Sequence, residues 1–241
     1  MSKDKLFSKP QGKVDDFKFN NSVVTVFDDM VSRSVPFYGE IQRMMTEIIA
    51  DFAVKDKCIY DLGCSTGTTL LNLDAVIDPA IRFVGIDNSP EMLKKCRSNF
   101  EAAGMKRPFD LRQVDLNQGI TIENASVVIM CLTLQFVRPI YREKLIEDIC
   151  KQLDSFNCLI MVEKVLGEDS IFNRLFIKYY YDMKRRNHYS DIEISQKREA
   201  LENVLIPYKL LENRELLLRS GFRYVDTFFK WYNFSGIVAV K

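Results

Sequence analysis

The spacing of apolar residues changes along the chain, from a helical period near the start to short runs of strand length further on. Helical spacing begins near Ser22 and is interrupted at Pro36, and a second amphipathic helix is expected over about 37–52. From Lys57 onward, apolar runs of strand length recur, mostly with helical segments between them, at 58–62, 82–86, 109–114, 126–132 and 157–162. Strands that alternate with helices predict βαβ units, and therefore an α/β fold with a mostly parallel sheet.

The remaining segments extend this pattern at both ends. The spacing is helical again over 168–218, and the final stretch, FRYVDTFFKWYNFSGIVAVK, predicts two adjacent strands without locating the turn between them. Residues 1–21 are polar and irregular, as expected of an N-terminal arm. We therefore predict a single domain over 1–241, in which 22–52 and 168–218 are helical additions to the sheet.

The charge balance and the scarcity of metal-binding side chains argue against several classes of function. The 241 residues include 34 basic and 33 acidic side chains, a net charge of +1, so no overall field favours nucleic acid or an anionic membrane. Six cysteines without a Cys-x-x-Cys spacing and one histidine argue against a metal site. The start, MSKDKLFSKP, lacks the apolar core of a signal peptide, and no run reaches membrane-spanning length, so we expect a cytoplasmic protein.

The segment DLGCSTGTTL, residues 61–70, indicates the class of ligand. It lies between an apolar run and a predicted helix, where glycine lets the backbone approach a ligand and the helix N-terminus offers unpaired N–H groups. The next apolar run ends at Asp87, where a carboxylate can accept both hydroxyl groups of a ribose. The pattern therefore predicts a nucleoside ligand.

The spacing of the glycines separates two kinds of nucleoside site. A dinucleotide site requires Gly-x-Gly-x-x-Gly, whereas here Asp61 is followed by Gly63, Ser65 and Gly67 at alternate positions. This order resembles the S-adenosylmethionine-binding loop of Rossmann-like methyltransferases, which usually has three alternate glycines, so Ser65 is a departure. Asp115 ends the third run and matches the usual partner of the adenine amino group in that superfamily. The alternative is a glycine turn with two unrelated acids.

The segment after the fourth run gives little indication of the reaction. Amino-methyltransferases of this fold often have Asn/Asp-Pro-Pro-Tyr there, and this chain has CLTLQF, which begins at Cys131. No residue in it suits the activation of a nucleophile. Cys131 itself is either a nucleophile, which requires a lowered pKa, or a buried structural residue, which the lack of a nearby histidine in the sequence favours.

The whole chain resembles the carboxy-S-adenosyl-L-methionine synthases, a family within the Rossmann-like methyltransferase superfamily. The resemblance rests on RSVPFY (33–38), YDLGCS (60–65), IDNSPEM (86–92), IENAS (122–126), LTLQF (132–136), EISQKR (193–198), LENV (201–204) and NFSG (233–236). It implies a Rossmann-like methyltransferase fold with a mostly parallel seven-stranded sheet, an antiparallel C-terminal strand and added helices. It also implies that S-adenosyl-L-methionine and prephenate become carboxy-S-adenosyl-L-methionine and phenylpyruvate. That product is the donor for 5-carboxymethoxyuridine at the tRNA wobble position.

The resemblance also implies a set of site residues. Arg198 matches the family's arginine that pairs with the new carboxylate, for which a guanidinium offers two parallel hydrogen bonds. Cys131 falls where the family can have a ligand-contacting asparagine. The predicted ligand-binding residues are Tyr38, Gly63, Cys64, Ser65, Asp87, Asn88, Asp115, Leu116, Cys131 and Arg198.

Partners and alternatives follow from the same resemblance. The family is homodimeric, and 22–52 and 168–218 are the expected contacts. Its substrates are small molecules, so no direct nucleic-acid contact is expected, and Lys184-Arg185-Arg186 is read as a helix-end or solvent-facing cluster. Arg33 is a candidate either for a prephenate carboxylate or for a cap or ion pair. From the sequence alone, Arg198 would be a solvated helix arginine.

Two other classes of function remain open beside the synthase. One is a methyltransferase that acts on a small molecule or tRNA, which keeps every argument about the adenosyl site. The other is a module that binds S-adenosylmethionine without turnover, which the lack of an evident general base would suit.

Overall fold

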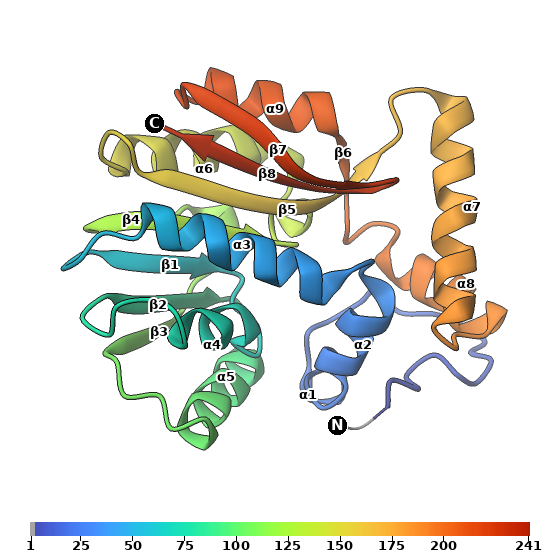
Figure 1. The fold of residues 1–241 in the computed structure, drawn as a ribbon. Coiled ribbons are helices and arrows are strands. Elements are labelled where there is room, and N and C mark those ends of the chain that lie inside the picture. The colour runs from blue at the N-terminus through green and yellow to red at the C-terminus, as the bar shows by residue number, and fades with distance from the viewer. Residues whose placement is uncertain (1–2) are drawn as a thin grey trace.

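In residues 3–241, which the computed structural model describes, eight strands form one sheet of order β3-β2-β1-β4-β5-β8-β7, with β6 paired to β5 beside this path (Figure 1). The strands are β1 (Cys58–Leu62), β2 (Arg82–Asp87), β3 (Phe109–Gln113), β4 (Ala125–Cys131), β5 (Cys158–Leu166), β6 (Tyr208–Lys209), β7 (Tyr224–Trp231) and β8 (Phe234–Val240). Each predicted strand run is present, with ends that differ by a few residues.

Strand directions confirm the predicted fold class. β1 pairs in parallel with β2 and β4, β2 with β3, and β4 with β5. The last strand, β8, lies between β5 and β7 and is antiparallel to both. The turn that the sequence did not locate is at Tyr232 and Asn233, directly before β8. The result is a mostly parallel sheet with an antiparallel C-terminal strand.

Helices cover both faces of the sheet, which is why the central strands β4 and β5 are buried on both sides. The helices are α1 (Asn21–Val24), α2 (Phe27–Ser34), α3 (Tyr38–Phe52), α4 (Thr68–Asp74), α5 (Pro90–Ala102), α6 (Pro139–Gln152), α7 (Ser170–Arg186), α8 (Asp191–Leu201) and α9 (Leu210–Arg219), with the short 3₁₀ helices η1 (Leu116–Gln118) and η2 (Leu134–Phe136). Buried side chains of α3, α4 and α5 pack on one face, and those of α6 and α9 pack on the other.

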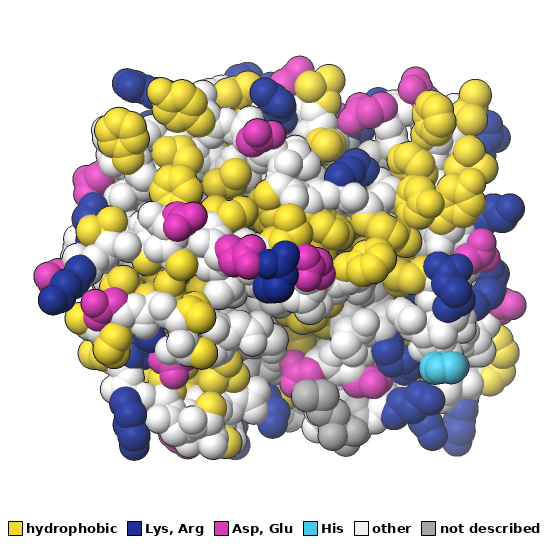
Figure 2. Space-filling model, in the orientation of Figure 1, with side chains coloured by type: hydrophobic (Ala, Val, Ile, Leu, Met, Phe, Trp, Pro, Cys, Tyr) yellow, Lys and Arg dark blue, Asp and Glu magenta, His cyan; other side chains and the backbone are white. Residues whose placement is uncertain are grey.

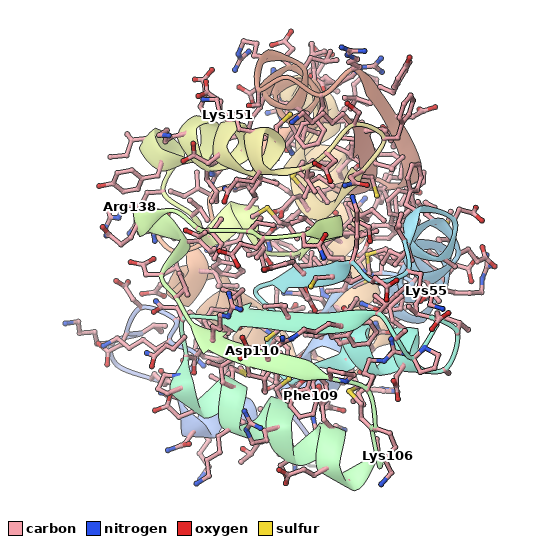
Figure 3. The ribbon with its side chains drawn as sticks, turned by 90° about the vertical axis from the view of Figure 1, so that its left-hand side faces the viewer. Lys55, Lys106, Phe109, Asp110, Arg138 and Lys151 are labelled. Atoms are coloured by element: carbon pink, nitrogen blue, oxygen red, sulfur yellow. The ribbon has the colours of Figure 1, made fainter. Side chains whose placement is uncertain are left out.

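Successive side chains along β4 point to opposite faces of the sheet and belong to two different hydrophobic clusters. Val127 and Ile129 belong to the cluster under α3–α5, whereas Val128 and Met130 belong to the cluster under α6 and α9. Strand β3 forms one edge of the sheet, next to α5, and the labelled Phe109 lies on it (Figure 3). The sheet therefore has two separate cores, and the carboxyl ends of its parallel strands remain free to form a site.

The helical additions are more divided than the sequence predicted. The helix expected from Ser22 to Pro36 is two helices, α1 and α2, with a break at Thr25 and Val26. The segment 168–218 contains α7, α8, the short strand β6 and all of α9 except its last residue. In Figure 1, α7 and α8 lie beyond the end of the sheet, next to α2 and the N-terminal arm. Within residues 3–241, no helix combines the length and apolarity needed to cross a membrane.

Candidate functional site

One cavity of about 500 Å³ contains all the residues that the sequence predicted for the ligand. It lies at the carboxyl ends of β1, β2 and β4, on the line between β1 and β4 where the strand order reverses. Open α/β sheets bind ligands at this point. Its lining includes Tyr38, Gly63, Cys64, Ser65, Asp87, Asn88, Asp115, Leu116, Cys131 and Arg198.

The loop after β1 requires glycine for two reasons at Gly63. Its φ angle is +84°, and a Cβ atom there would collide with the side chain of Thr133. The N–H groups of Gly63 and Cys64 both donate to the carbonyl of Ile86, at 2.7 and 2.9 Å, which holds the loop against β2. Ser65 replaces the middle glycine and still has a φ angle of +50°. Ser65 therefore adopts the left-handed backbone conformation that favours glycine.

Asp87 lies at the end of β2 and is held by backbone donors. Oδ2 accepts from the N–H of Ser65 at 2.9 Å, and Oδ1 accepts from the N–H of Ser89 at 2.9 Å. Burial raises the pKa of this carboxyl group, although these N–H groups oppose the shift. Each oxygen retains a lone pair, so the fixed carboxylate can accept hydrogen bonds from two hydroxyl groups of a ligand.

The carboxylate of Asp115 is fixed in a similar way at the end of β3. Its Oδ1 accepts from the backbone and side-chain N–H groups of Asn117 at 3.0 and 2.7 Å, and it begins the 3₁₀ helix η1. Leu116 follows it as a largely buried wall of the cavity. The pair thus presents one polar acceptor and one apolar surface to the position expected for an adenine ring.

Asp61, beneath the loop, is an acidic residue without a partner. It is 2% exposed, and its Oδ1 is buried without a hydrogen bond within residues 3–241. Burial, together with the nearby charge of Asp87, raises the pKa of Asp61 to about 7. A cationic ligand such as S-adenosylmethionine, with an ammonium and a sulfonium, fits this uncompensated carboxyl group.

Cys131 is not activated as a nucleophile. Its Sγ lies 3.8 Å from Nε2 of Gln42, and burial together with the charges of Asp61 and Glu163 raises the pKa of the thiol. A nucleophilic cysteine needs the opposite shift. Burial likewise raises the pKa of Tyr38 well above its ordinary value. Both groups therefore stay protonated near neutral pH.

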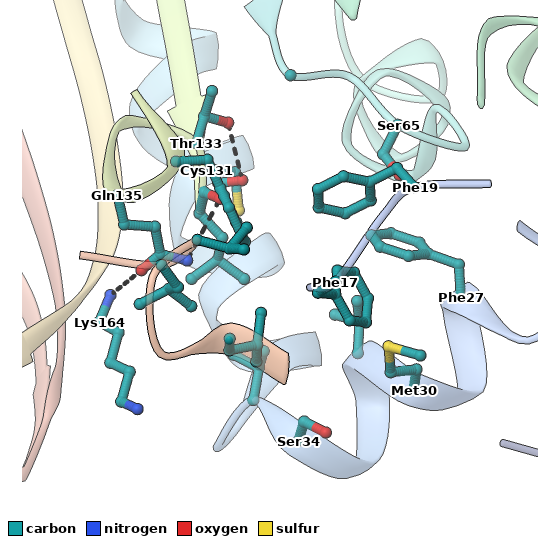
Figure 4. A pocket seen from close by; sticks show the side chains of 18 of the residues that line it. Phe17, Phe19, Phe27, Met30, Ser34, Ser65, Cys131, Thr133, Gln135 and Lys164 are labelled. Atoms are coloured by element: carbon teal, nitrogen blue, oxygen red, sulfur yellow. Dashed lines mark hydrogen bonds between the residues drawn. The ribbon is translucent and has the colours of Figure 1, made fainter. Parts of the chain in front are cut away.

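A buried carboxyl group holds the loop after β4. Glu163 of β5 accepts hydrogen bonds from the backbone N–H groups of Thr133 and Leu134 through Oε1, at 3.1 and 2.8 Å, and from Gln135 through Oε2, at 2.9 Å. Burial raises its pKa to about 8 in spite of these donors. Oε1 of Gln135 in turn accepts from the N–H of Lys164 at 3.0 Å (Figure 4). The CLTLQF segment is thus a fixed wall.

The N-terminal arm forms the opposite wall, which sequence analysis missed. Figure 4 shows Phe17, Phe19 and Phe27 facing the cavity, with Cys131, Thr133, Gln135 and Lys164 across from them. The N–H of Phe17 donates to the carbonyl of Ala200 at 2.9 Å, and Ser89 donates to the carbonyl of Phe19 at 2.7 Å. Phe17 and Phe19, two aromatic residues in a polar stretch, were the sequence feature that could have indicated this wall.

Arg198 reaches the cavity from the last turn of α8 and is exposed. Within residues 3–241 its guanidinium forms no hydrogen bond or ion pair, so it is available for a ligand. Arg33 is not among the lining residues: it pairs with Asp29 at 3.2 Å and donates to the carbonyls of Asn187 and His188 at 2.9 and 2.8 Å. Of the two roles considered for Arg33, the structure shows the ion pair.

The cluster Lys184-Arg185-Arg186 is only partly what the sequence suggested. Arg185 is a surface residue that pairs with Asp182 and Asp191, each at 2.8 Å. Lys184, in contrast, is 5% exposed and lines the cavity. It lies in the last turn of α7, as the helix-end prediction had it, but the solvent-facing alternative is wrong for this residue.

The chain matches known proteins in sequence and in fold. Residues 59–155 match the model of a methyltransferase domain family. The chain is 58% identical over 242 residues to a carboxy-S-adenosyl-L-methionine synthase of Methylococcus capsulatus, with both chains fully covered. It is 42% identical to a protein of that name from Desulfotalea psychrophila, over 99% of this chain and 97% of that protein.

Two solved structures show the same fold at low identity. An Aquifex aeolicus SAM-dependent methyltransferase has a TM-score of 0.60 and 17% identity, over 92% of this chain and 98% of that one. Human N-acetylserotonin methyltransferase in complex with SAM has a TM-score of 0.62 and 16% identity, over 90% of this chain and 54% of that one.

Proposed function

The chain belongs to the carboxy-S-adenosyl-L-methionine synthase family, and from this premise we propose that prephenate donates the carboxyl group and leaves as phenylpyruvate. S-adenosyl-L-methionine is the molecule that the enzyme modifies. The observation that supports the proposal most directly is the position of Arg198, a cation without a partner in residues 3–241, in the same cavity as the adenosyl loop. A cation at that point suits a product that gains a carboxylate.

We propose that the substrates supply most of the proton transfer themselves. The bond between the ring of prephenate and its carboxylate breaks, carbon dioxide is released, and the ring becomes aromatic as hydroxide leaves the opposite ring carbon. The sulfonium makes its methyl protons acidic, so the hydroxide takes one of them and becomes water. The resulting ylide carbon forms a bond to the carbon dioxide. No protein base is required, which agrees with the protonated states of Cys131 and Tyr38.

The chain's own residues would bind and orient the substrates, and they would exclude water from the site. Asp61 would pair with the ammonium group of S-adenosylmethionine, Asp87 would accept the ribose hydroxyls, and Asp115 would accept from the adenine amino group. Arg198 would hold the new carboxylate through two parallel hydrogen bonds. The aromatic wall with Phe17 and Phe19 would keep water from the ylide and the carbon dioxide.

A product assay by mass spectrometry tests this function. Purified protein is incubated with S-adenosylmethionine, with and without prephenate, and the nucleoside products are weighed. We expect a mass gain equal to one carbon dioxide only with prephenate. Formation of S-adenosylhomocysteine with an added acceptor would instead support methyl transfer, and no change under either condition would support a binding module.

We further propose a homodimer in the cytoplasm, with the product used for wobble-uridine modification of tRNA by another enzyme. The dimer is supported by a hydrophobic band over α7 and the tip of the β7–β8 hairpin (Figure 2). In this band Ile171, Phe172, Leu175 and Tyr232 are 63%, 53%, 38% and 41% exposed. A monomeric mass by light scattering at micromolar concentration would contradict the dimer.

A further inference from the structure

Three lysines converge on the cavity from elements outside the adenosyl loop. Lys164 lies at the end of β5, Lys184 in the last turn of α7 and Lys197 in α8, and all three line the cavity that contains Arg198. Lys184 and Lys197 are 5% and 6% exposed. Lysine is rarely buried to this degree unless it is paired. The partners of each ammonium group are therefore informative.

Lys197 has partners within the protein. Its Nζ donates to Oγ of Ser34 at 3.1 Å and lies 3.6 Å from Oδ2 of Asp4. Oδ2 of Asp4 also accepts from the hydroxyl of Tyr189 at 2.7 Å. This lysine is thus part of an internal network that ties the arm to α8.

Lys164 and Lys184 have no such partners. Within residues 3–241, neither ammonium group lies within 4 Å of a carboxylate, and neither forms a hydrogen bond. Both instead lie over the ring of Tyr180, with Nζ 5.1 and 4.7 Å from its centroid. The Nζ atoms of two lysines therefore lie near one aromatic ring on the cavity wall. Figure 4 shows the side chain of Lys164 extending beyond Gln135 along this wall.

Burial of these two ammonium groups without a counter-ion within residues 3–241 is energetically unfavourable. Burial lowers the pKa of Lys164 to about 8. Burial lowers the pKa of Lys184 well below its ordinary value, and the charges of Lys197 and Lys164 add to that effect. A cation–π contact offsets only part of the desolvation of an ammonium group. An anionic ligand in the cavity would supply the missing charge.

We propose that Lys164 and Lys184 form a second anion subsite, which binds the carboxylate that the carboxyl donor retains. This inference rests on the proposed function. Prephenate has two carboxylates: one leaves as carbon dioxide, and the other remains in phenylpyruvate. Arg198 receives the carboxylate formed on the methyl carbon, so the retained one requires a separate cation. Tyr180 and Tyr181, which line the same wall, offer flat surfaces beside the donor's ring.

Substitution by methionine tests the subsite, because methionine has a similar length and no charge. K164M, K184M and the double variant are compared with K178M, an exposed lysine of the same helix α7 outside the cavity. We expect KM for prephenate to rise by about tenfold in each single variant and further in the double variant. The Kd for S-adenosylmethionine, measured by calorimetry, should change less than about twofold. Tm should stay equal or rise, because a buried unpaired cation is removed.

Several results would overturn the subsite. An unchanged KM for prephenate in the double variant is one, and an equal loss of S-adenosylmethionine affinity is another. K184R should restore much of the affinity if charge is what matters, and a failure to do so contradicts the proposal. If the unmodified protein makes no carboxylated product, the proposed function fails. The subsite is then tested by calorimetric binding of prephenate to the S-adenosylmethionine-loaded protein, which the double variant must lose.

Discussion

The two halves of the cavity differ in how completely the protein satisfies its own charges. In the adenosyl half, Asp87 and Asp115 already accept backbone hydrogen bonds and are fixed before a ligand arrives, and Asp61 is the one acid there with a buried oxygen that lacks a hydrogen bond within residues 3–241. In the donor half, Lys164, Lys184 and Arg198 are cations without partners in residues 3–241. The first half belongs to the common fold and is preorganised. The second includes residues of the added helices α7 and α8, and we propose that an anionic ligand completes it and that the reaction is specified there.

Arg198→Ala should have the largest effect and should separate the two halves. Removal of the guanidinium leaves the new carboxylate without its cation, so we expect kcat/KM for carboxylation to fall by about 100-fold or more. The Kd for S-adenosylmethionine should change less than about threefold. Product mass spectrometry and calorimetry measure the two quantities. R198K should be intermediate, since lysine keeps the charge but not the paired hydrogen bonds. Unchanged carboxylation in R198A would refute the assigned role.

Asp4→Ala tests whether the arm stabilises the donor half. The substitution leaves the buried Lys197 without its carboxylate partner, so we expect the free energy of unfolding to fall by about 3 kcal/mol. Urea denaturation measures it. Asp15→Ala, at an exposed position on the same arm, is the matched control and should change stability by less than about 0.5 kcal/mol. Equal stability of the two variants would show that the arm does not hold α8.

Gly63→Ala tests how tightly the adenosyl half is built. Both Gly63 and Gly104 have positive φ angles, +84° and +70°, but only at Gly63 does an added Cβ collide with a neighbour, Thr133. G104A should therefore cost about 1 kcal/mol from backbone strain alone. G63A should cost about 2 kcal/mol or more and weaken S-adenosylmethionine binding. If G63A and G104A have equal Tm values and equal ligand affinities, the loop is not constrained as described.

The acidic and alkaline limbs of the pH profile should come from different halves of the cavity. On each limb, affinity for the ligand should change by at most about tenfold per pH unit. Asp61 has a pKa of about 7, so as pH falls below that value it becomes neutral and S-adenosylmethionine affinity decreases. Lys164 has a pKa of about 8, and burial also lowers the pKa of its neighbour Lys184 well below the ordinary value, so as pH rises above about 8 the pair loses charge and KM for prephenate increases. D61N should remove the acidic limb and K164R should move the alkaline one upward. A profile unchanged by both variants would contradict these assignments.

The sequence correctly indicated that the residues of the adenosyl half lie together, because its signals are local. Gly63, Asp87 and Asp115 each follow an apolar run, and the carboxyl ends of parallel strands meet at one edge of the sheet. The donor half was largely missed because burial there depends on contacts between distant segments. Lys184 looked like part of a basic helix end, and only the packing of the arm and α8 encloses it. Its spacing of four from Tyr180 on α7 was a usable sign of a shared face.

The arm and the helix breaks were missed for a related reason. Nothing in the apolar period near Thr25 marks the break between α1 and α2, which tertiary packing decides. Residues 1–21 read as polar, although Phe17 and Phe19 form a wall of the cavity. A few aromatic side chains in an otherwise polar segment contribute little to a periodicity, yet they decide where the segment packs.

The position of helix α7 has a consequence for how the KM for prephenate depends on enzyme concentration. Its first turns contain the exposed Ile171 and Phe172, and its last turn contains Lys184 in the cavity. If the proposed dimer covers the first turns, α7 joins the subunit contact to the proposed donor site. Association and donor affinity should then be thermodynamically linked, each strengthening the other by the same factor. The KM for prephenate would decrease as enzyme concentration rises through the dimer dissociation constant, and a KM independent of that concentration would show that the two events are uncoupled.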